Sequence, residues 1–120
     1  MSEESQLQSV MPGFPVRDMD RAVSFYTREL GFHLTFRNGA IFSIVCRDAV
    51  EVTLSLAPAG RDPGPAHCYV RVTGVDDFHR EFRERGVTMT HPLRDEEYGM
   101  REFMVTDPDG NTLNFGEPIP

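Results

Sequence analysis

Few side chains of this sequence could do covalent or metal chemistry, and their spacing does not gather them. All twelve basic residues are arginine, so a lysine nucleophile or a Schiff base is excluded. No serine sits in the strained turn that a catalytic serine needs, and no glycine-rich phosphate loop is present. The histidines are His33, His67, His79 and His91. No two of them are spaced so as to converge on one metal ion.

Composition excludes several classes of partner. The chain has 120 residues, enough for one domain with its own core. Its net charge of −7 argues against nucleic acid, which needs a basic surface, and favours a cationic ligand. No apolar run could span a membrane, and the polar N-terminus lacks signal-peptide features. The cysteines, Cys46 and Cys68, have no metal or disulfide spacing, so free thiols and a cytoplasmic location are expected.

The first half of the chain predicts a strand, a helix and three more strands. The strand at 10–16 contains Pro12 and Pro15, which suits the edge of a sheet. Asp18 is expected to cap a helix that ends at Gly31. The apolar stripe of this helix is Met19, Ala22, Val23, Tyr26 and Leu30. The further strands are expected at 32–37, 40–47 and 50–56.

The second half repeats this order. Residues 16–20 align with residues 72–76, which indicates a duplicated βαβββ unit. The expected elements are strands at 67–72, 87–90, 101–106 and 112–115, a helix from Val75 to Gly86, and a loop at 91–99 with a solvated acidic cluster at 95–97. The predicted fold class is α+β, with the two modules forming a curled mixed sheet around a cleft. The predicted parts are an arm at 1–8, module one at 9–57, a linker at 58–66 and module two at 67–117.

Two motifs carry a family resemblance. The segment VRDMDRAVSFYTRELGF at 16–32 and the segment TDPDGNTLNF at 106–115 resemble signatures of the vicinal oxygen chelate superfamily. This superfamily includes glyoxalases, extradiol dioxygenases, fosfomycin-resistance enzymes and bleomycin-resistance proteins. The resemblance covers roughly residues 9–117 and implies the fold, but this fold hosts both enzymes and drug binders.

The resemblance also implies where a metal would bind in the enzymes. Their ligand positions fall on Met11, Thr53, His67 and Asn114, where Asn114 replaces a glutamate. This set holds one imidazole and no carboxylate, which is poor chemistry for zinc, iron or manganese. Glu51 lies two residues before Thr53 and shares its strand face, so His67, Glu51 and Asn114 are the only ligands left for a metal.

The chain most resembles the bleomycin-resistance branch. Three features carry this likeness: the absence of the metal ligands, Pro12 in the first strand, and the segment 98–115. That likeness implies a homodimer that binds a drug in grooves between its subunits, with no cofactor. Strand alternation places Glu51, Thr53 and Ser55, then His67, Tyr69 and Arg71, then Asn114, on the cleft face. The opposite face is expected to carry Val52, Leu54, Leu56, Cys68, Val70, Val72, Leu113 and Phe115.

Several aromatic residues have two readings. Phe36 and Phe42 flank the hairpin at Asn38-Gly39. The resemblance to the drug-binding branch implies that they stack on a planar ligand, and the alternative is that both belong to the core. Tyr98 either closes over a ligand or packs on Met100. Arg101 is a groove candidate or the partner of Glu102 in a surface ion pair.

The favoured interpretation is a non-enzymatic protein that sequesters an antibiotic-like ligand, cationic or aromatic. The predicted site comprises Phe36, Phe42, Glu51, Thr53, His67, Tyr69, Tyr98, Arg101 and Asn114. One alternative is a metal-dependent lyase, transferase or dioxygenase that uses a divalent metal as a Lewis acid. Another is a domain that binds a metabolite or a protein and confers no resistance.

Overall fold

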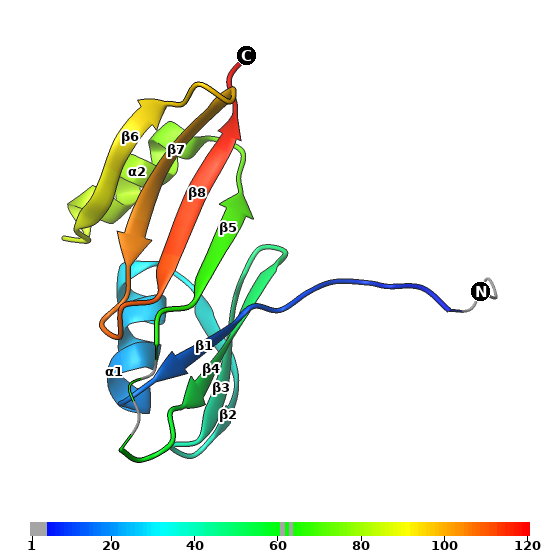
Figure 1. Cartoon of the computed structure of the whole chain (residues 1–120), viewed down its shortest axis with the longest axis vertical. Helices are drawn as coiled ribbons and strands as arrows, with labels where there is room; N and C mark the ends of the chain where they lie inside the picture. The colour runs from blue at the N-terminus through cyan, green and yellow to red at the C-terminus, as the bar shows by residue number, and fades with distance from the viewer. Residues whose placement is uncertain (1–4, 61, 63) are drawn as a thin grey trace.

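The chain folds into two modules of the same element order, as Figure 1 shows for the computed structural model. The structure describes residues 5–60, 62 and 64–120, so the first four residues of the expected arm and positions 61 and 63 of the expected linker lie outside it. Module one contains β1 (Gly13–Val16), α1 (Met19–Ser24), η1 (Phe25–Glu29), β2 (His33–Asn38), β3 (Phe42–Arg47) and β4 (Val50–Leu56). Module two contains β5 (His67–Arg71), α2 (Val75–Glu84), β6 (Met89–Asp95), β7 (Met100–Thr106) and β8 (Thr112–Pro118).

The strands form two mixed sheets of four, which confirms the α+β class and the two βαβββ modules. Sheet one has the order β1-β4-β3-β2 and sheet two has the order β5-β8-β7-β6. The first strand of each module pairs in parallel with the last, and the other neighbours are antiparallel. Among the described residues, no strand pairing joins the two sheets, so the expected curled sheet is realised as two separate halves.

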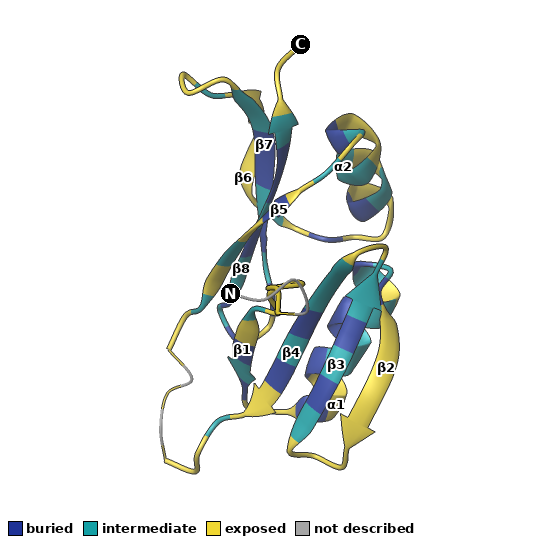
Figure 2. Cartoon of the chain, turned by 90° about the vertical axis from the view of Figure 1, so that its right-hand side faces the viewer, coloured by how far each residue is buried: buried dark blue, intermediate teal, exposed yellow. Residues whose placement is uncertain are grey.

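The first helix is set by its cap and its apolar stripe. The Asp18 side chain accepts a hydrogen bond from the backbone N–H of Arg21 at 3.1 Å. Helix α1 continues through the π-turn η1, and Gly31 then takes a φ of 75°, a conformation that glycine adopts readily. The stripe residues Met19, Ala22, Tyr26 and Leu30 are buried, as predicted. The helix therefore covers one face of sheet one (Figure 2).

The DPDGN turn explains how the modules are held together. The Tyr26 hydroxyl donates to Asp107 at 2.9 Å, and the Asn111 amide donates to the Pro15 carbonyl at 2.9 Å. The backbone N–H of Arg17 donates to Asp109 at 3.0 Å. A turn of module two thus bonds to β1 and η1 of module one, and we call this group the turn clasp.

The sequence predictions are wrong at several element boundaries. The expected loop at 91–99 is largely strand, because β6 runs to Asp95 and tolerates Pro92 at the outer edge of sheet two. Strand β1 begins at Gly13 and not at Val10, whose side chain is 86% exposed. Strand β8 continues to Pro118. Leu56, expected in the core, is 41% exposed at the end of β4. Among the described residues, no helix has the length and apolar character needed to cross a membrane.

Candidate functional site

Each sheet has one face covered by its helix and one open face. In sheet one the covered face holds Ser43, Val45, Val52 and Leu54, all fully buried. The opposite, open face holds Phe42, Ile44, Cys46, Glu51, Thr53 and Ser55, and the strand register places them in adjacent pairs. Glu51 and Thr53 are half-buried there. Strand alternation therefore assigned the faces of β4 correctly, apart from its last residue.

An aromatic pair lies on the open face of sheet one. The rings of Phe36 and Phe42 have centroids 6.2 Å apart with an interplanar angle of 59°. Phe36 is 51% exposed and Phe42 is half-buried. Because Phe36 is largely exposed, the interpretation of both rings as core is wrong. An exposed pair of rings is a surface on which a planar group can stack.

The open face of sheet two carries His67, Tyr69 and Asn114. Tyr69 pairs with Asn114 in the register of β5 and β8, and His67 pairs with Thr112. The His67 ring lies 2.6 Å from the Thr112 hydroxyl through Nδ1, so this histidine is bonded to its strand neighbour. The opposite face, with Val70, Leu113 and Phe115, packs under α2, as the alternation predicted.

The two open faces point in different directions (Figures 1 and 2). Within one chain they meet only at the junction of the modules, where a hollow of about 380 Å³ lies. Its lining includes Glu51, Tyr69, Arg71, Cys68 and Val10. The structure thus brings Glu51 and Tyr69 together. It leaves the aromatic pair on one face, and His67 with Asn114 on the other.

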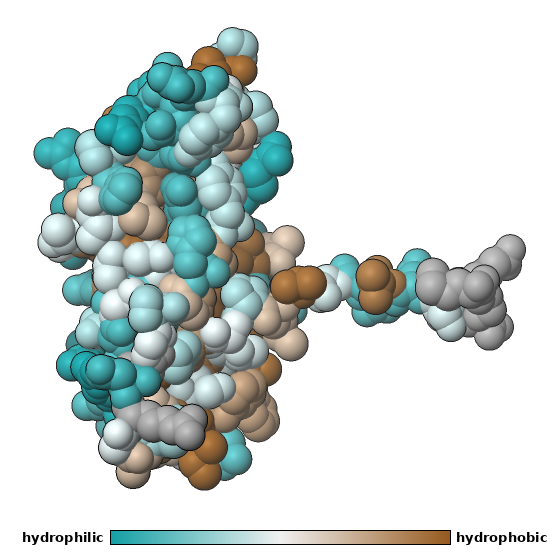
Figure 3. All heavy atoms as spheres, viewed as in Figure 1, coloured by the Kyte–Doolittle hydropathy of each residue, from teal (hydrophilic) through white to brown (hydrophobic). Residues whose placement is uncertain are grey.

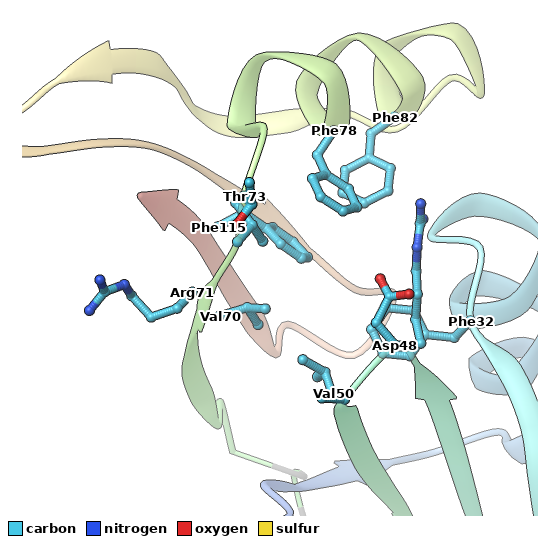
Figure 4. A pocket seen from close by; sticks show the side chains of 12 residues that line it. Phe32, Asp48, Val50, Val70, Arg71, Thr73, Phe78, Phe82 and Phe115 are labelled. Carbon is cyan, nitrogen blue, oxygen red and sulfur yellow. The ribbon is translucent and has the colours of Figure 1, made fainter. Parts of the chain in front are cut away.

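A second cavity of about 280 Å³ adjoins this hollow and shares four lining residues with it. Figure 4 shows Phe78 and Phe82 projecting from α2 toward this cavity, with Phe32 and Phe115 on its other sides. The guanidinium of Arg71 points away from it (Figure 4). The junction of the modules therefore has an aromatic cavity next to a hollow with polar lining residues.

Two predicted site residues lie elsewhere. Tyr98 is 66% exposed in the turn between β6 and β7, at the far end of sheet two from His67. Arg101 lies on the helix side of sheet two and bonds Asp76 at 2.8 Å and Asp95 at 3.0 Å. The expected ion pair between Arg101 and Glu102 is wrong, because Glu102 is buried on the opposite face.

The residues at the family's metal positions do not fit a divalent ion. Met11 is 47% exposed, and the Thr53 hydroxyl donates to the Pro12 carbonyl at 3.3 Å. Thr53 lies on sheet one, whereas His67 and Asn114 lie on sheet two. Across residues 5–60, 62 and 64–120, no three His, Cys, Asp or Glu side chains converge as metal ligands. Neutral oxygen donors and one imidazole leave the charge of a divalent ion unbalanced.

Sequence reasoning missed two residues of the open face of sheet two. Glu102 on β7 is only 5% exposed, and Gly116 on β8 lies beside it in register. A glycine in the middle of a strand signals the close approach of another group. Applied to Gly116, that signal would have directed attention to this face.

Comparisons with known proteins agree with one another. A family model described as Glyoxalase/Bleomycin resistance protein/Dioxygenase superfamily matches residues 6–115. Bleomycin resistance proteins of Geobacillus stearothermophilus and Staphylococcus aureus are each 28% identical over 135 residues, which cover 94% of this chain and 98% of theirs. A bleomycin-binding protein solved in complex with bleomycin is 25% identical with a TM-score of 0.81, covering 92% of this chain and 98% of that one. The bleomycin-binding protein of Streptomyces verticillus, solved with copper(II)-bleomycin, is 28% identical with a TM-score of 0.77, covering 92% and 96%.

Proposed function

Because this chain belongs to the glyoxalase/bleomycin resistance protein/dioxygenase superfamily, we propose that it binds a bleomycin-like antibiotic and sequesters it without chemical change. The observation that carries the proposal is the exposed pair of Phe36 and Phe42 on an uncovered sheet face, in a chain that aligns over nearly its whole length with bleomycin resistance proteins. Such rings supply stacking area for a planar ligand. No cofactor is part of the proposal.

Binding is favoured over catalysis by the side chains that occupy the family's ligand positions. Met11, Thr53 and Asn114 offer neutral donors, and His67 is the only imidazole among the four. The thiol of Cys68 is not an activated nucleophile, since burial raises its pKa to about 11. Both cysteines are free, which supports a cytoplasmic location within this proposal.

The net charge of −7 supports a cationic ligand, because it attracts positive charge over the whole surface. Glu51 is half-buried and lines the junction hollow, which Tyr69 also lines. A ligand with an aromatic part and a positive part therefore matches both kinds of surface.

A second copy of the chain is proposed to complete the groove. The two open faces of one chain do not close over each other, so each offers half of a site. The arm formed by residues 5–12 leaves the body at Val10 and Pro12, which border the junction hollow. Beyond that point it extends away from the body, as Figure 3 shows. Leu7 is 99% exposed and Val10 is 86% exposed. Apolar side chains in such an arm gain stability when a partner covers them.

Titration with bleomycin tests the binding function. We expect the full chain to bind the drug in isothermal titration calorimetry, with Phe36→Ala weakening the affinity about tenfold. The control is Ile119→Ala, which removes a partly exposed apolar side chain at the end of the chain and should leave the affinity unchanged. Mass spectrometry after incubation should recover the drug intact. Absence of binding would exclude the proposal, and a modified drug or a requirement for added Zn²⁺ or Mn²⁺ would favour the enzyme alternative.

The dimer is tested by placing charge on the arm. In sedimentation equilibrium, the double variant Leu7→Asp with Val10→Asp should dissociate at protein concentrations at least about tenfold higher than the wild type, because it buries charge in the contact. Gln8→Asp adds charge to the same arm without removing an apolar side chain, and should have a much smaller effect. Equal dissociation in all three proteins would show that the arm takes no part, and a monomeric wild type would contradict the dimer.

A further inference from the structure

Glu102 is a buried acid that has no part in the groove proposed above. It lies on β7, and its neighbour Phe103 packs under α2 with 1% exposure, so the Glu102 side chain projects onto the open face of sheet two. It is nevertheless only 5% exposed. Within the described part of the chain, its Oε2 atom has no hydrogen-bond partner. A buried acceptor left unpaired is uncommon in folded proteins and calls for an explanation.

Because Gly116 has no side chain, the Tyr69 ring has room to cover the Glu102 carboxyl group. A Cβ atom on Gly116 would lie 2.0 Å from the Tyr69 hydroxyl and 2.9 Å from the Glu102 Cβ. The phenol of Tyr69 therefore rests over the bare backbone of β8 and reaches Glu102. Burial raises the pKa of Tyr69 to about 12, assisted by its hydrogen bond to Glu102 and the charge of that group. Tyr69 acts as a cover over one buried acid.

A second unpaired acceptor lies beside the first. Asn114 on β8 pairs with Tyr69 on β5. It is the diagonal neighbour of Glu102 on β7, because Glu102 pairs with Gly116, two residues further along β8. Its Oδ1 atom is also buried, and no donor among the residues described reaches it. Two neighbouring oxygen acceptors, one of them a carboxyl, form a site for a group that carries several N–H donors.

The charged neighbours leave this site open to such a group. Arg94 is opposite Glu102 on β6, but its guanidinium donates to Glu96 at 2.7 Å. Arg71 on β5 pairs with Gly116, which separates it from Glu102 on β7, and the side chain of Arg71 is exposed. Tyr69 is 40% exposed and borders the junction hollow, so rotation of its side chain would uncover both acceptors to a ligand there.

We propose that Glu102 and Asn114 anchor a nitrogen cation of the ligand, such as an amidine, a guanidine or a primary amine, when Tyr69 rotates off Gly116. This inference rests on the proposed function, because it names the part of the ligand that the second sheet recognises. The cation replaces the Tyr69 hydroxyl on the carboxyl group and supplies the missing donor to Asn114. A bond to a charged donor is stronger than the phenol bond that it replaces.

Two small probes isolate this contact from the rest of a drug. Benzamidine and benzamide share a planar ring, and only the first is a cation. In NMR titrations of the full chain, we expect benzamidine to shift the Asn114 side-chain amide and to bind at least about tenfold tighter than benzamide. Glu102→Gln should abolish this preference. Glu97→Gln, the same change at an exposed position, should retain it.

Tyr69→Phe gives a second and opposite readout. It keeps the ring and removes the hydroxyl that competes for Glu102, so benzamidine should bind about fivefold tighter than to the wild type. The anchor is overturned if the two probes bind alike, if neither binds, or if Glu102→Gln leaves benzamidine binding unchanged. A parallel titration with bleomycin reports on the proposed function separately. If bleomycin binds but benzamidine is not preferred, only the proposed cation anchor is contradicted. If benzamidine is preferred but bleomycin does not bind, only the proposed drug-binding function is contradicted.

Discussion

Replacing Asp107 by alanine is expected to lower the free energy of unfolding by about 3 kcal/mol, among the larger single-residue effects in this chain. Its carboxyl group accepts from the backbone N–H groups of Asp109 at 2.8 Å and Asn111 at 2.9 Å. It also accepts from the Tyr26 hydroxyl and the Asn111 amide, each at 2.9 Å. Alanine would leave the Tyr26 hydroxyl, which is fully buried, without its acceptor.

Urea unfolding followed by circular dichroism measures this loss. Asp107→Asn keeps an oxygen for the backbone donors but turns an amide toward Tyr26, so an intermediate loss is expected. The matched control is Asp62→Ala, which removes an acid whose side chain is 87% exposed and paired with Arg17 at the surface. That change should cost less than about 0.5 kcal/mol. Equal losses for Asp107→Ala and Asp62→Ala would contradict the structural role of the turn clasp.

Local signals in the sequence predicted most of the fold. The cap at Asp18 and the apolar stripe of the first helix depend on residues close together in the chain, and both are confirmed. The repeat is also confirmed, because the alignment of residues 16–20 with residues 72–76 places the first residue of α1 on the first residue of α2. Strand β6 is longer than the strand predicted at 87–90. Pro92 reads as a loop residue, and only its place at a sheet edge allows the strand to continue to Asp95.

The candidate site was predicted less completely, for a reason of geometry. Alternation along one strand indicates which residues share a face, and it correctly grouped Glu51 with Thr53 and His67 with Tyr69. It does not say how two sheets are oriented, so it could not reveal that these pairs lie on faces that point in different directions. Burial of Glu102 depends on a tyrosine two strands away and a glycine between them. The spacing of residues within a single strand cannot predict a contact that involves three strands.

The comparisons and the structure constrain the function from different sides. The family model that matches residues 6–115 identifies the family. Similarity to bleomycin resistance proteins over 94% of the chain indicates which kind of ligand to test first. The structure adds what each open sheet face offers in one chain: an aromatic pair on sheet one, and on sheet two an acid buried beneath Tyr69. Because both modules must be fixed relative to each other for these surfaces to contribute to one site, the contacts between modules also matter for binding.

Another contact between the modules involves Arg47, and its removal is expected to cost about 2 kcal/mol at neutral pH. The guanidinium donates to both oxygens of Glu81 on α2, at 2.7 and 2.8 Å. It also donates to the Leu30 carbonyl at 2.8 Å and lies 4.8 Å from the ring centre of Phe78. Arg47→Met keeps the length of the side chain and removes all of these bonds. Arg80→Met, at an exposed pair with Asp77, is the control and should change stability by less than about 0.5 kcal/mol.

The cost of Arg47→Met should depend on pH in a defined direction. The hydrogen bonds from Arg47 lower the pKa of Glu81, although burial opposes them. A lowered pKa in the folded state means that the pair contributes its full stability above the ordinary glutamate pKa of 4.5 and loses it as the pH falls through the folded value. Urea unfolding at about pH 7 and about pH 3 should therefore show a smaller difference between the variant and the wild type in acid. A difference that is equal at both pH values would mean that Arg47 stabilises the junction through its bond to Leu30 and its contact with Phe78, and not through Glu81.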